Sequence, residues 1–342
     1  MKEKVPEISV IMSNYNTKES YLRESIESIL NQTFNDFEFI IIDDNSTSNS
    51  IEIIESYKDK RIKILRNDQN LGLASSLNKG IRYSKGNYIA RMDADDVSIN
   101  TRLEKQFNYL ENNKDIHILG TKARIFGEKK GIREIIPCTS EYIRTEFLFT
   151  VGLTHPSIMM RKEFINKFNL FYNEEFIKSQ DYEFWSRCAE LGKLYEYPEV
   201  LLNYRVSNTQ ASIKYSDIQN HYANLVRIEN LKKLGIYPTK KQIEIHYSLS
   251  RGIYDEKVDL IDMLDWCKIL LDSNNKSEIY PKMIFEKILM KHLLVIIIKF
   301  LKGKKSINHH VFSHYVFKKF LSIKFFPTYA TRLMASLRFK FL

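Results

Sequence analysis

The stretch that decides the fold spans residues 70–96 and reads NLGLASSLNKGIRYSKGNYIARMDADD. Apolar side chains recur in it at helical spacing from Leu73 to Tyr83. A short apolar run, Tyr88 to Met92, follows and ends directly in the acidic residues 93–96. A buried strand that ends in polar side chains is typical of open α/β sheets, which bind ligands beyond the carboxyl ends of their strands. The stretch therefore predicts a helix, a strand and a ligand-facing loop.

The same pattern extends toward the N-terminus. Residues 8–13, 37–42 and 61–65 read as buried strands that alternate with helical stretches, which predicts a mainly parallel sheet flanked by helices. Each predicted strand ends in a polar group, and each group alone also fits a turn or a helix cap. Four such groups in order along one sheet edge favour a ligand site; they are Ser13–Asn16, Asp43–Ser46, Asn70–Gly72 and Asp93–Asp96.

The rhythm changes after about residue 115. Longer strand-like runs cover 116–126 and 157–160, a helix is expected around 181–191, and the chain is mostly helical from about residue 215. We therefore expect a sheet domain over residues 1–215, with halves that meet near residue 115, and a helical C-terminal region over residues 216–342.

Composition excludes several classes of protein. With 342 residues, 44% hydrophobic and 27% charged, the chain is neither disordered nor repetitive. Its three cysteines are too few and too scattered for a disulfide framework. The N-terminus lacks the features of an export signal, and no apolar run is long enough to span a membrane. We therefore expect a cytoplasmic protein.

The basic charge is concentrated near the C-terminus. The net charge is +10, but residues 282–342 hold 13 Lys and Arg against the single acid Glu286, whereas residues 1–281 hold 39 bases and 41 acids. From Lys287 to Lys302 the lysines fall on one side of a helical wheel. This apolar stretch is too short to cross a ~30 Å hydrocarbon core. We expect the segment partly to lie on an anionic membrane surface and partly to pack as helices on the catalytic domain, with its lysines in solvent. Its aliphatic bulk argues against nucleic acid as a partner.

The acidic cluster suggests a metal. Asp93, Asp95 and Asp96 repel one another unless they are solvated or bound to a cation, and hard oxygen ligands suit Mg²⁺ or Mn²⁺. These ions also bridge phosphates, so the cluster fits a nucleotide diphosphate. The alternative is a solvated turn that caps the next helix.

Taken together, these motifs resemble the family 2 glycosyltransferases, an inverting group with the GT-A fold, a Rossmann-like sheet. The resemblance covers roughly residues 7–190 and is carried by ISVIMSNYN, SILNQTFNDFEFIIIDDNSTSN, the stretch at 70–96, THPSIMMRK and SQDYEFW. The chain has no Gly-x-Gly-x-x-Gly loop and no Walker motif, which argues against the two commonest other nucleotide-binding folds.

The resemblance implies roles for the polar groups. Tyr15 would lie against the nucleobase and Asp44, or Asp43, on its polar edge, while Asp93 would lie near the ribose. Asp95 would hold the metal, with Asp96 as a neighbouring ligand or orienting group. The remaining residues expected to bind the donor are Ser13, Asn70 and Gly72.

The family's general base usually lies in an acidic pair at the start of a helix, and Gln180-Asp181 matches that position with Gln in place of Glu. The resemblance therefore makes Asp181 the base that takes the proton of the acceptor hydroxyl. One carboxylate suffices for inversion if a cation stabilises the departing diphosphate. The alternative role for Asp181 is a helix N-terminal acid, favoured by the macrodipole.

His155 and Trp185 are weaker candidates for the acceptor side. His155 has no His or Cys at ligand spacing and could be structural, and Trp185 lies one helical turn after Asp181, where it could stack on a sugar or belong to the core. The Gln-x-x-Arg-Trp signature of the family's processive synthases is missing. This absence favours a single-addition enzyme.

We therefore expect a metal-dependent, inverting, nonprocessive glycosyltransferase that uses a nucleotide sugar, most simply a UDP-sugar. Its acceptor would be a glycan or a lipid-linked saccharide in bacterial surface polysaccharide biosynthesis, at the inner face of the cell membrane. The alternative, kept open by Gln180, is a catalytically silent module of the same fold that binds nucleotide sugars at the membrane.

Overall fold

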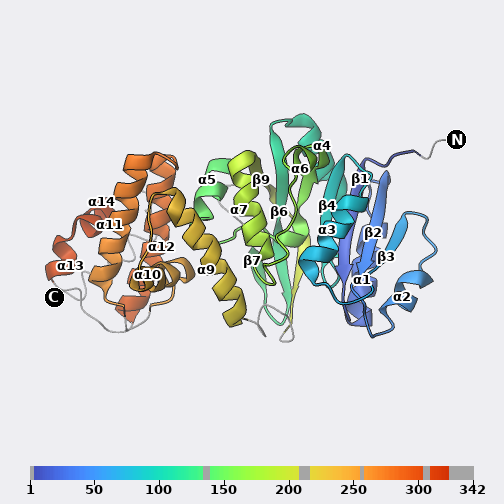
Figure 1. Ribbon diagram of the computed structural model, residues 1–342, viewed down its shortest axis with the longest axis horizontal. Helices are drawn as coiled ribbons and strands as arrows, with labels where there is room; N and C mark the ends of the chain where they lie inside the picture. The colour runs from blue at the N-terminus through green and yellow to red at the C-terminus, as the bar shows by residue number, and fades with distance from the viewer. Residues whose placement is uncertain (1–3, 134–138, 208–215, 255–257, 303–308, 323–342) are drawn as a thin grey trace. The chain divides into compact units, whose positions relative to one another are not determined.

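The computed structural model describes residues 4–133, 139–207, 216–254, 258–302 and 309–322. The chain divides into two compact units (Figure 1). The first contains Met1–Arg144 and Val151–Ala223, and the second contains Thr145–Thr150 and Asn224–Leu342. The short segment Thr145–Thr150 thus belongs to the second unit although it lies between two parts of the first in sequence.

One sheet forms the centre of the first unit. Among the described residues it has nine strands, in the order β3-β2-β1-β4-β8-β6-β9-β5, with β7 paired to β6. The strands are β1 (Ile8–Asn14), β2 (Phe37–Asp43), β3 (Ile62–Arg66), β4 (Tyr88–Asp93), β5 (Val97–Ser98), β6 (Ile116–Gly127), β7 (Gly131–Arg133), β8 (Met159–Arg161) and β9 (Lys193–Val206). The strand order reverses between β1 and β4, and open α/β sheets commonly bind ligands beyond the carboxyl ends of the strands at such a reversal.

Strands β1 to β4 are parallel, as the sequence pattern predicts. Strands β5, β7 and β8 add antiparallel pairs, which make the whole sheet mixed. The helices of this unit are α1 (Glu19–Leu30), α2 (Ser50–Ser56), α3 (Leu73–Tyr83), α4 (Arg102–Asn112), α6 (Lys162–Lys167) and α7 (Gln180–Leu191). Two further helices, α5 (Ser140–Glu146) and α9 (Ser216–Lys233), are divided between the two units.

Burial on both faces explains why the strands read as continuous apolar runs. Side chains of β1, β2 and β4 form one core with the buried faces of α1, α2 and α4. Helix α3 packs on the opposite face, where a Cβ on Gly80 would lie only 3.0–3.3 Å from Ile42 and Ile11. This close approach fixes α3 against the sheet and with it the loop that precedes α3.

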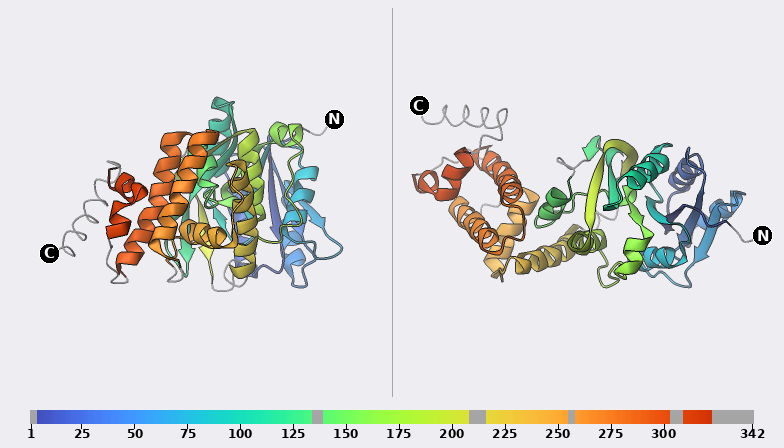
Figure 2. Two further views of the ribbon diagram at one scale, coloured as in Figure 1. Left: turned by 60° about the vertical axis from the view of Figure 1, so that its left-hand side comes forward. Right: turned by 90° about the horizontal axis from the view of Figure 1, so that it is seen from above.

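The second unit is helical. Its remaining helices are α10 (Lys240–Arg251), α11 (Leu260–Ser277), α12 (Lys282–Lys302), α13 (His309–Ser313) and α14 (Tyr315–Ser322), and α11 contacts each of the other four (Figure 2). His246 fixes Thr145–Thr150 in this unit. Its Nδ1 accepts a hydrogen bond from Trp266 Nε1 at 3.2 Å, so its Nε2 carries the proton that it donates to the carbonyl oxygen of Leu148 at 2.9 Å. The expectation of an α/β fold followed by a mostly helical C-terminal region is confirmed.

The structure shows how α12 packs. Its apolar side chains are buried in the second unit, and Lys291 bonds the buried carboxylate of Glu146 at 2.8 and 2.9 Å. Expecting this apolar face to lie on a membrane was therefore wrong, because the same stripe is the core of a helical unit. No helix in the described ranges is both long and apolar enough to span a bilayer. Residues 303–308 and 323–342, which hold much of the basic charge, lie outside the described residues.

Candidate active site

The acidic turn after β4 brings three carboxylates together. Single ligand atoms of Asp93, Asp95 and Asp96 lie within 4.8 Å of one another. Asp96 is fully buried, and its Oδ1 accepts the backbone N–H of Arg205 at 2.7 Å. Its Oδ2 has no hydrogen-bond partner among the described residues. Burial, reinforced by the charges of Asp93 and Asp95, raises the pKa of Asp96 well above its ordinary value. A divalent cation would satisfy this orphaned oxygen and relieve the repulsion, so the donor set fits Mg²⁺ or Mn²⁺.

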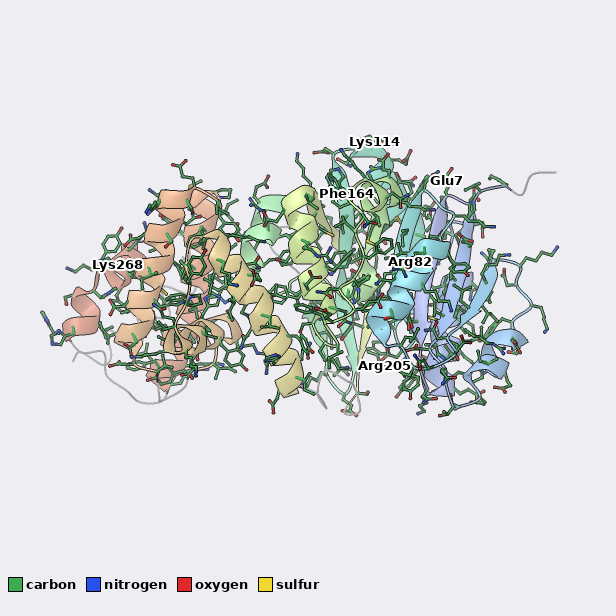
Figure 3. All side chains as sticks on the ribbon, in the orientation of Figure 1. Glu7, Arg82, Lys114, Phe164, Arg205 and Lys268 are labelled. Atoms are coloured by element: carbon green, nitrogen blue, oxygen red, sulfur yellow. The ribbon has the colours of Figure 1, made fainter. Side chains whose placement is uncertain are left out.

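Two arginines that the sequence analysis did not single out hold this turn. The fully buried Arg91 bonds Asp93 Oδ1 through Nη2 at 2.5 Å. Arg205, near the end of β9, donates from Nε to the carbonyl oxygen of Asp95 at 2.7 Å and pairs with Glu24 at 2.5 Å. In Figure 3, Arg205 lies at the opposite end of the sheet from Glu7 and Lys114. Arg91 and Arg205 therefore both hold the turn in place through its Asp93 side chain and its Asp95 carbonyl oxygen.

Asp44 positions the loop before α3. Its Oδ1 accepts from the side chain of Asn67 at 2.7 Å and from the N–H of Leu71 at 2.9 Å, and its Oδ2 accepts from the N–H of Gly72 at 2.8 Å. Gly72 has a φ of 86°, which other residues rarely adopt, and Asn70 is exposed beside it. Both oxygens of Asp44 thus bind groups of this loop and its surroundings.

Asp43 joins the loops that follow β1 and β2. It accepts from Asn14 Nδ2 at 2.8 Å and from the N–H of Ser46 at 3.0 Å. Ser13 is half-buried at the end of β1, and Tyr15 is 51% exposed in the next loop. An exposed aromatic ring beside a fixed acidic loop is available to stack on a flat ligand.

The acceptor-side candidate, Asp181, is the second residue of α7. The helix begins after Ser179, which has a left-handed backbone with a φ of 55°. Asp181 Oδ1 accepts the N–H of Tyr182 at 2.8 Å. Burial raises the pKa of Asp181, and the charges of Arg133 and Arg91 oppose that rise. The carboxylate is therefore partly desolvated, and its second oxygen makes no hydrogen bond within the described residues, so it can accept a proton as a base does.

One pocket contains both the acidic turn and Asp181. It has a volume of about 480 Å³, and its charged lining residues are Arg91, Asp93, Asp95, Lys129, Arg133, Lys178 and Asp181, with His155 and Tyr204 beside them. The sequence analysis missed all four basic residues, because single Lys and Arg in loops carry no pattern. The donor candidates after β1, β2 and β3, with Asp96 and Trp185, are not among the described residues that line this pocket.

His155 is buried, and its Nε2 lies 2.7 Å from the hydroxyl of Tyr172. Burial and the nearby charge of Arg91 hold the pKa of His155 well below its usual range, so the ring is neutral. Trp185 is 0% exposed and packs edge-on against His155 with ring centroids 5.7 Å apart. The expectation that Trp185 could stack on an acceptor sugar was therefore wrong: the ring belongs to the core behind the pocket.

Comparison with known proteins identifies the family. The sequence profile of Glycosyl transferase family 2 matches residues 9–168. An uncharacterized glycosyltransferase of Methanocaldococcus jannaschii is 42% identical over 295 residues, which cover 81% of this chain and 97% of the relative. This chain belongs to glycosyl transferase family 2. The resemblance drawn from the motifs is confirmed, and the protein is a glycosyltransferase.

Two further comparisons are informative. The UDP-Glc:alpha-D-GlcNAc-diphosphoundecaprenol beta-1,3-glucosyltransferase WfaP of Escherichia coli is 27% identical, over 72% of this chain and 94% of WfaP. The crystal structure of S. aureus TarS residues 1–349 in complex with UDP superposes with a TM-score of 0.58 at 16% identity, over 88% of this chain and 93% of that one. At this identity TarS supports the fold alone, and it confirms the GT-A fold.

Proposed function

We propose that this glycosyltransferase moves a sugar from a UDP-sugar to a glycan or lipid-linked saccharide, with inversion, one addition at a time and with a divalent cation. The observation that carries the proposal is the single pocket that contains both the acidic turn, Asp93 and Asp95, and the desolvated Asp181. Direct displacement needs a charge-stabilising site for the leaving diphosphate and a base on the opposite side of the anomeric carbon. The pocket offers one group of each kind.

The proposed donor, a UDP-sugar, rests on the residues of this chain and on the ligands named for two similar proteins. WfaP is named for UDP-Glc, and TarS has been crystallised with UDP. In this chain, Tyr15 would stack on the nucleobase. The loops that Asp43 and Asp44 hold in place would surround the nucleoside, together with Ser13, Asn70 and Gly72. Asp95, with Asp93 and Asp96, would hold Mg²⁺ or Mn²⁺. A bound cation would supply Lewis-acid stabilisation of charge on the leaving phosphate.

The chain's own residues would then perform the proton transfer. The free oxygen of Asp181 would accept the proton of the acceptor hydroxyl as that oxygen attacks the anomeric carbon. The C–O bond to the diphosphate breaks as the new C–O bond forms. His155, neutral and held by Tyr172, would shape the pocket wall without exchanging a proton.

The class of acceptor and the location of the protein in the cell are inferred from a relative and from the charge of the C-terminal segment. WfaP is named for a lipid-linked acceptor, and residues 282–342 carry 13 bases and one acid. We infer that residues 1–115 bind the donor, that residues 116–215 bind the acceptor, and that the basic C-terminal segment attracts the protein to the anionic inner face of the cell membrane. About 1 kcal/mol per base near such a surface would suffice for reversible attachment.

A panel of nucleotide sugars tests the proposal directly. We expect one UDP-sugar to be hydrolysed slowly without acceptor, with rates that rise on addition of Mn²⁺ or Mg²⁺ and vanish with EDTA. The alternative is a silent binding module, which would bind UDP but release none from any donor. Hydrolysis that EDTA leaves unchanged would contradict the cation requirement.

A further inference from the structure

The pocket holds more positive charge than the donor chemistry explains. Arg91 is paired with Asp93, and the cation expected at the acidic turn would neutralise the donor diphosphate. Arg133 and Lys129 also line the pocket, and neither pairs with a carboxylate of the described residues in any salt bridge observed. Lys129 is exposed, but Arg133 is half-buried. A half-buried guanidinium without a carboxylate partner costs desolvation energy, so Arg133 calls for an anion that arrives with a ligand.

The position of Arg133 indicates which ligand brings that anion. Arg133 ends β7, which is fixed by antiparallel pairing with Ala123 of β6. Its guanidinium lies 5.9 Å from the ring centroid of Tyr204, and its charge acts on both Asp181 and His155. Arg133 thus lies near the proposed base, Asp181, in the pocket that both residues line. In a direct displacement the acceptor binds next to the base.

We propose that Arg133, with Lys129 beside it, binds a phosphate group of the acceptor, so that the acceptor is a saccharide carrying a phosphodiester or diphosphate close to its reacting sugar. This inference rests on the proposed function and names the substrate class of the same pocket. A guanidinium forms paired hydrogen bonds with phosphate oxygens, and a nearby ammonium adds charge without fixing geometry. A neutral sugar would leave the half-buried guanidinium of Arg133 without an anion.

Binding to the full chain saturated with UDP and Mn²⁺ tests the proposal. The probes are GlcNAc joined through a diphosphate to an octyl chain, GlcNAc joined through a single phosphodiester to the same chain, and octyl GlcNAc without phosphate. We expect at least one phosphorylated probe to bind about ten- to a hundredfold more tightly than octyl GlcNAc. Whichever of the two binds better distinguishes a lipid diphosphate from a phosphodiester acceptor.

Variants assign this preference to residues. Arg133→Gln should remove most of it, Lys129→Gln part of it, and Arg133→Lys should restore part. Lys130→Gln is the matched control, because Lys130 is exposed on the same turn and is not among the residues that line the pocket. Thermal melts check that each variant folds, and the exposed Lys129 provides a variant that does not perturb packing. UDP affinity with Mn²⁺ should be unchanged throughout.

Three results would overturn the inference. Equal affinity of wild type for all three probes would show that no phosphate is recognised. Weaker UDP binding by Arg133→Gln would assign the arginine to the donor. A shift in the pH profile of turnover with unchanged probe affinity would make Arg133 a residue that adjusts Asp181. Metal-dependent donor hydrolysis, measured separately, shows whether the proposed function itself stands.

Discussion

Replacing Asp181 by Asn separates the catalytic from the structural role of this carboxylate. The amide is nearly isosteric, and its oxygen can still accept the N–H of Tyr182, now at 2.8 Å from Oδ1. The fold and donor binding should therefore persist. The base is lost, so turnover should fall by about 10²–10⁴, the range that general-base catalysis supplies. At about 1.36 kcal/mol per factor of ten, this is a rise of about 2.7–5.4 kcal/mol in the barrier.

The Asp181→Asn variant should lose activity but keep or gain thermal stability. Burial raises the pKa of Asp181 above that of an exposed carboxyl, so the folded chain holds the charged form at a cost. A group of this kind destabilises the fold increasingly as pH rises through its ordinary range. Asn carries no charge, and at neutral pH the variant should melt at the same temperature as wild type or higher. For the same reason, wild-type turnover should fall as acid protonates Asp181, and the residual activity of the variant should lack this acidic limb.

The assay is UDP release under saturating donor and acceptor, measured across pH and paired with a thermal melt. Glu183→Gln is the control, because Glu183 lies on the same helix but pairs with Arg187 at 2.6 Å and is not among the pocket-lining residues. It should lose little activity. Transfer by Asp181→Asn within a few-fold of wild type, with an intact acidic limb, would mean that another residue is the base.

Three other outcomes follow from the same contacts. Asp95→Ala should abolish the part of UDP affinity that Mn²⁺ adds, as measured by calorimetry with and without the ion; equal metal-enhanced binding by mutant and wild type would refute the assignment. Glu146→Gln should lower the free energy of unfolding by about 1–3 kcal/mol in urea titrations, because Lys291 and His292 lose a buried acceptor. The pKa of Glu146 is lowered, so this difference should be full above the ordinary Glu range and shrink as pH falls through the lowered value; a pH-independent difference would contradict it. A chain that ends at Ser322 should stay folded but co-sediment less with anionic vesicles, since it lacks four bases, whereas one that ends at Tyr280 loses α12 and should aggregate; full vesicle binding by the folded shorter chain would exclude residues 323–342 as the attachment segment.

Individual helices and strands could be predicted because the spacing of apolar residues within one short segment indicates each of them. The helix expected at 73–83 is observed as Leu73–Tyr83, and the strand expected at 88–92 is observed as Tyr88–Asp93. Each has a periodicity that one short window reveals. The polar strand ends were visible for the same reason, since parallel strands place their carboxyl ends along one edge whatever the loops do afterwards.

The rest of the site depends on contacts between residues far apart in sequence. Arg205 lies more than a hundred residues after the turn that it holds, and Arg133 belongs to a short strand defined only by its pairing with β6. The prediction that the apolar face of α12 lies on a membrane failed for a different reason. A helix rich in apolar residues with a stripe of lysines looks the same whether its apolar side meets lipid or other helices, and only the packing of α10 and α11 distinguishes the two.

The distribution of unsatisfied polar atoms supports the location of the site independently of any family. Burial without a partner costs about 1–3 kcal/mol per group, so folded proteins rarely keep such atoms unless function requires them. Twelve buried side-chain atoms of the described residues make no hydrogen bond, and five of them belong to three residues at or next to the acidic turn: Asp96 Oδ2, Arg91 Nε and Nη1, and Arg102 Nε and Nη2. Arg102 also donates to the carbonyl oxygen of Arg91 at 3.0 Å, which links these groups physically. Unsatisfied polar atoms of charged side chains thus gather at the acidic turn, where a cation and a diphosphate could bind, and this supports a binding role for the turn.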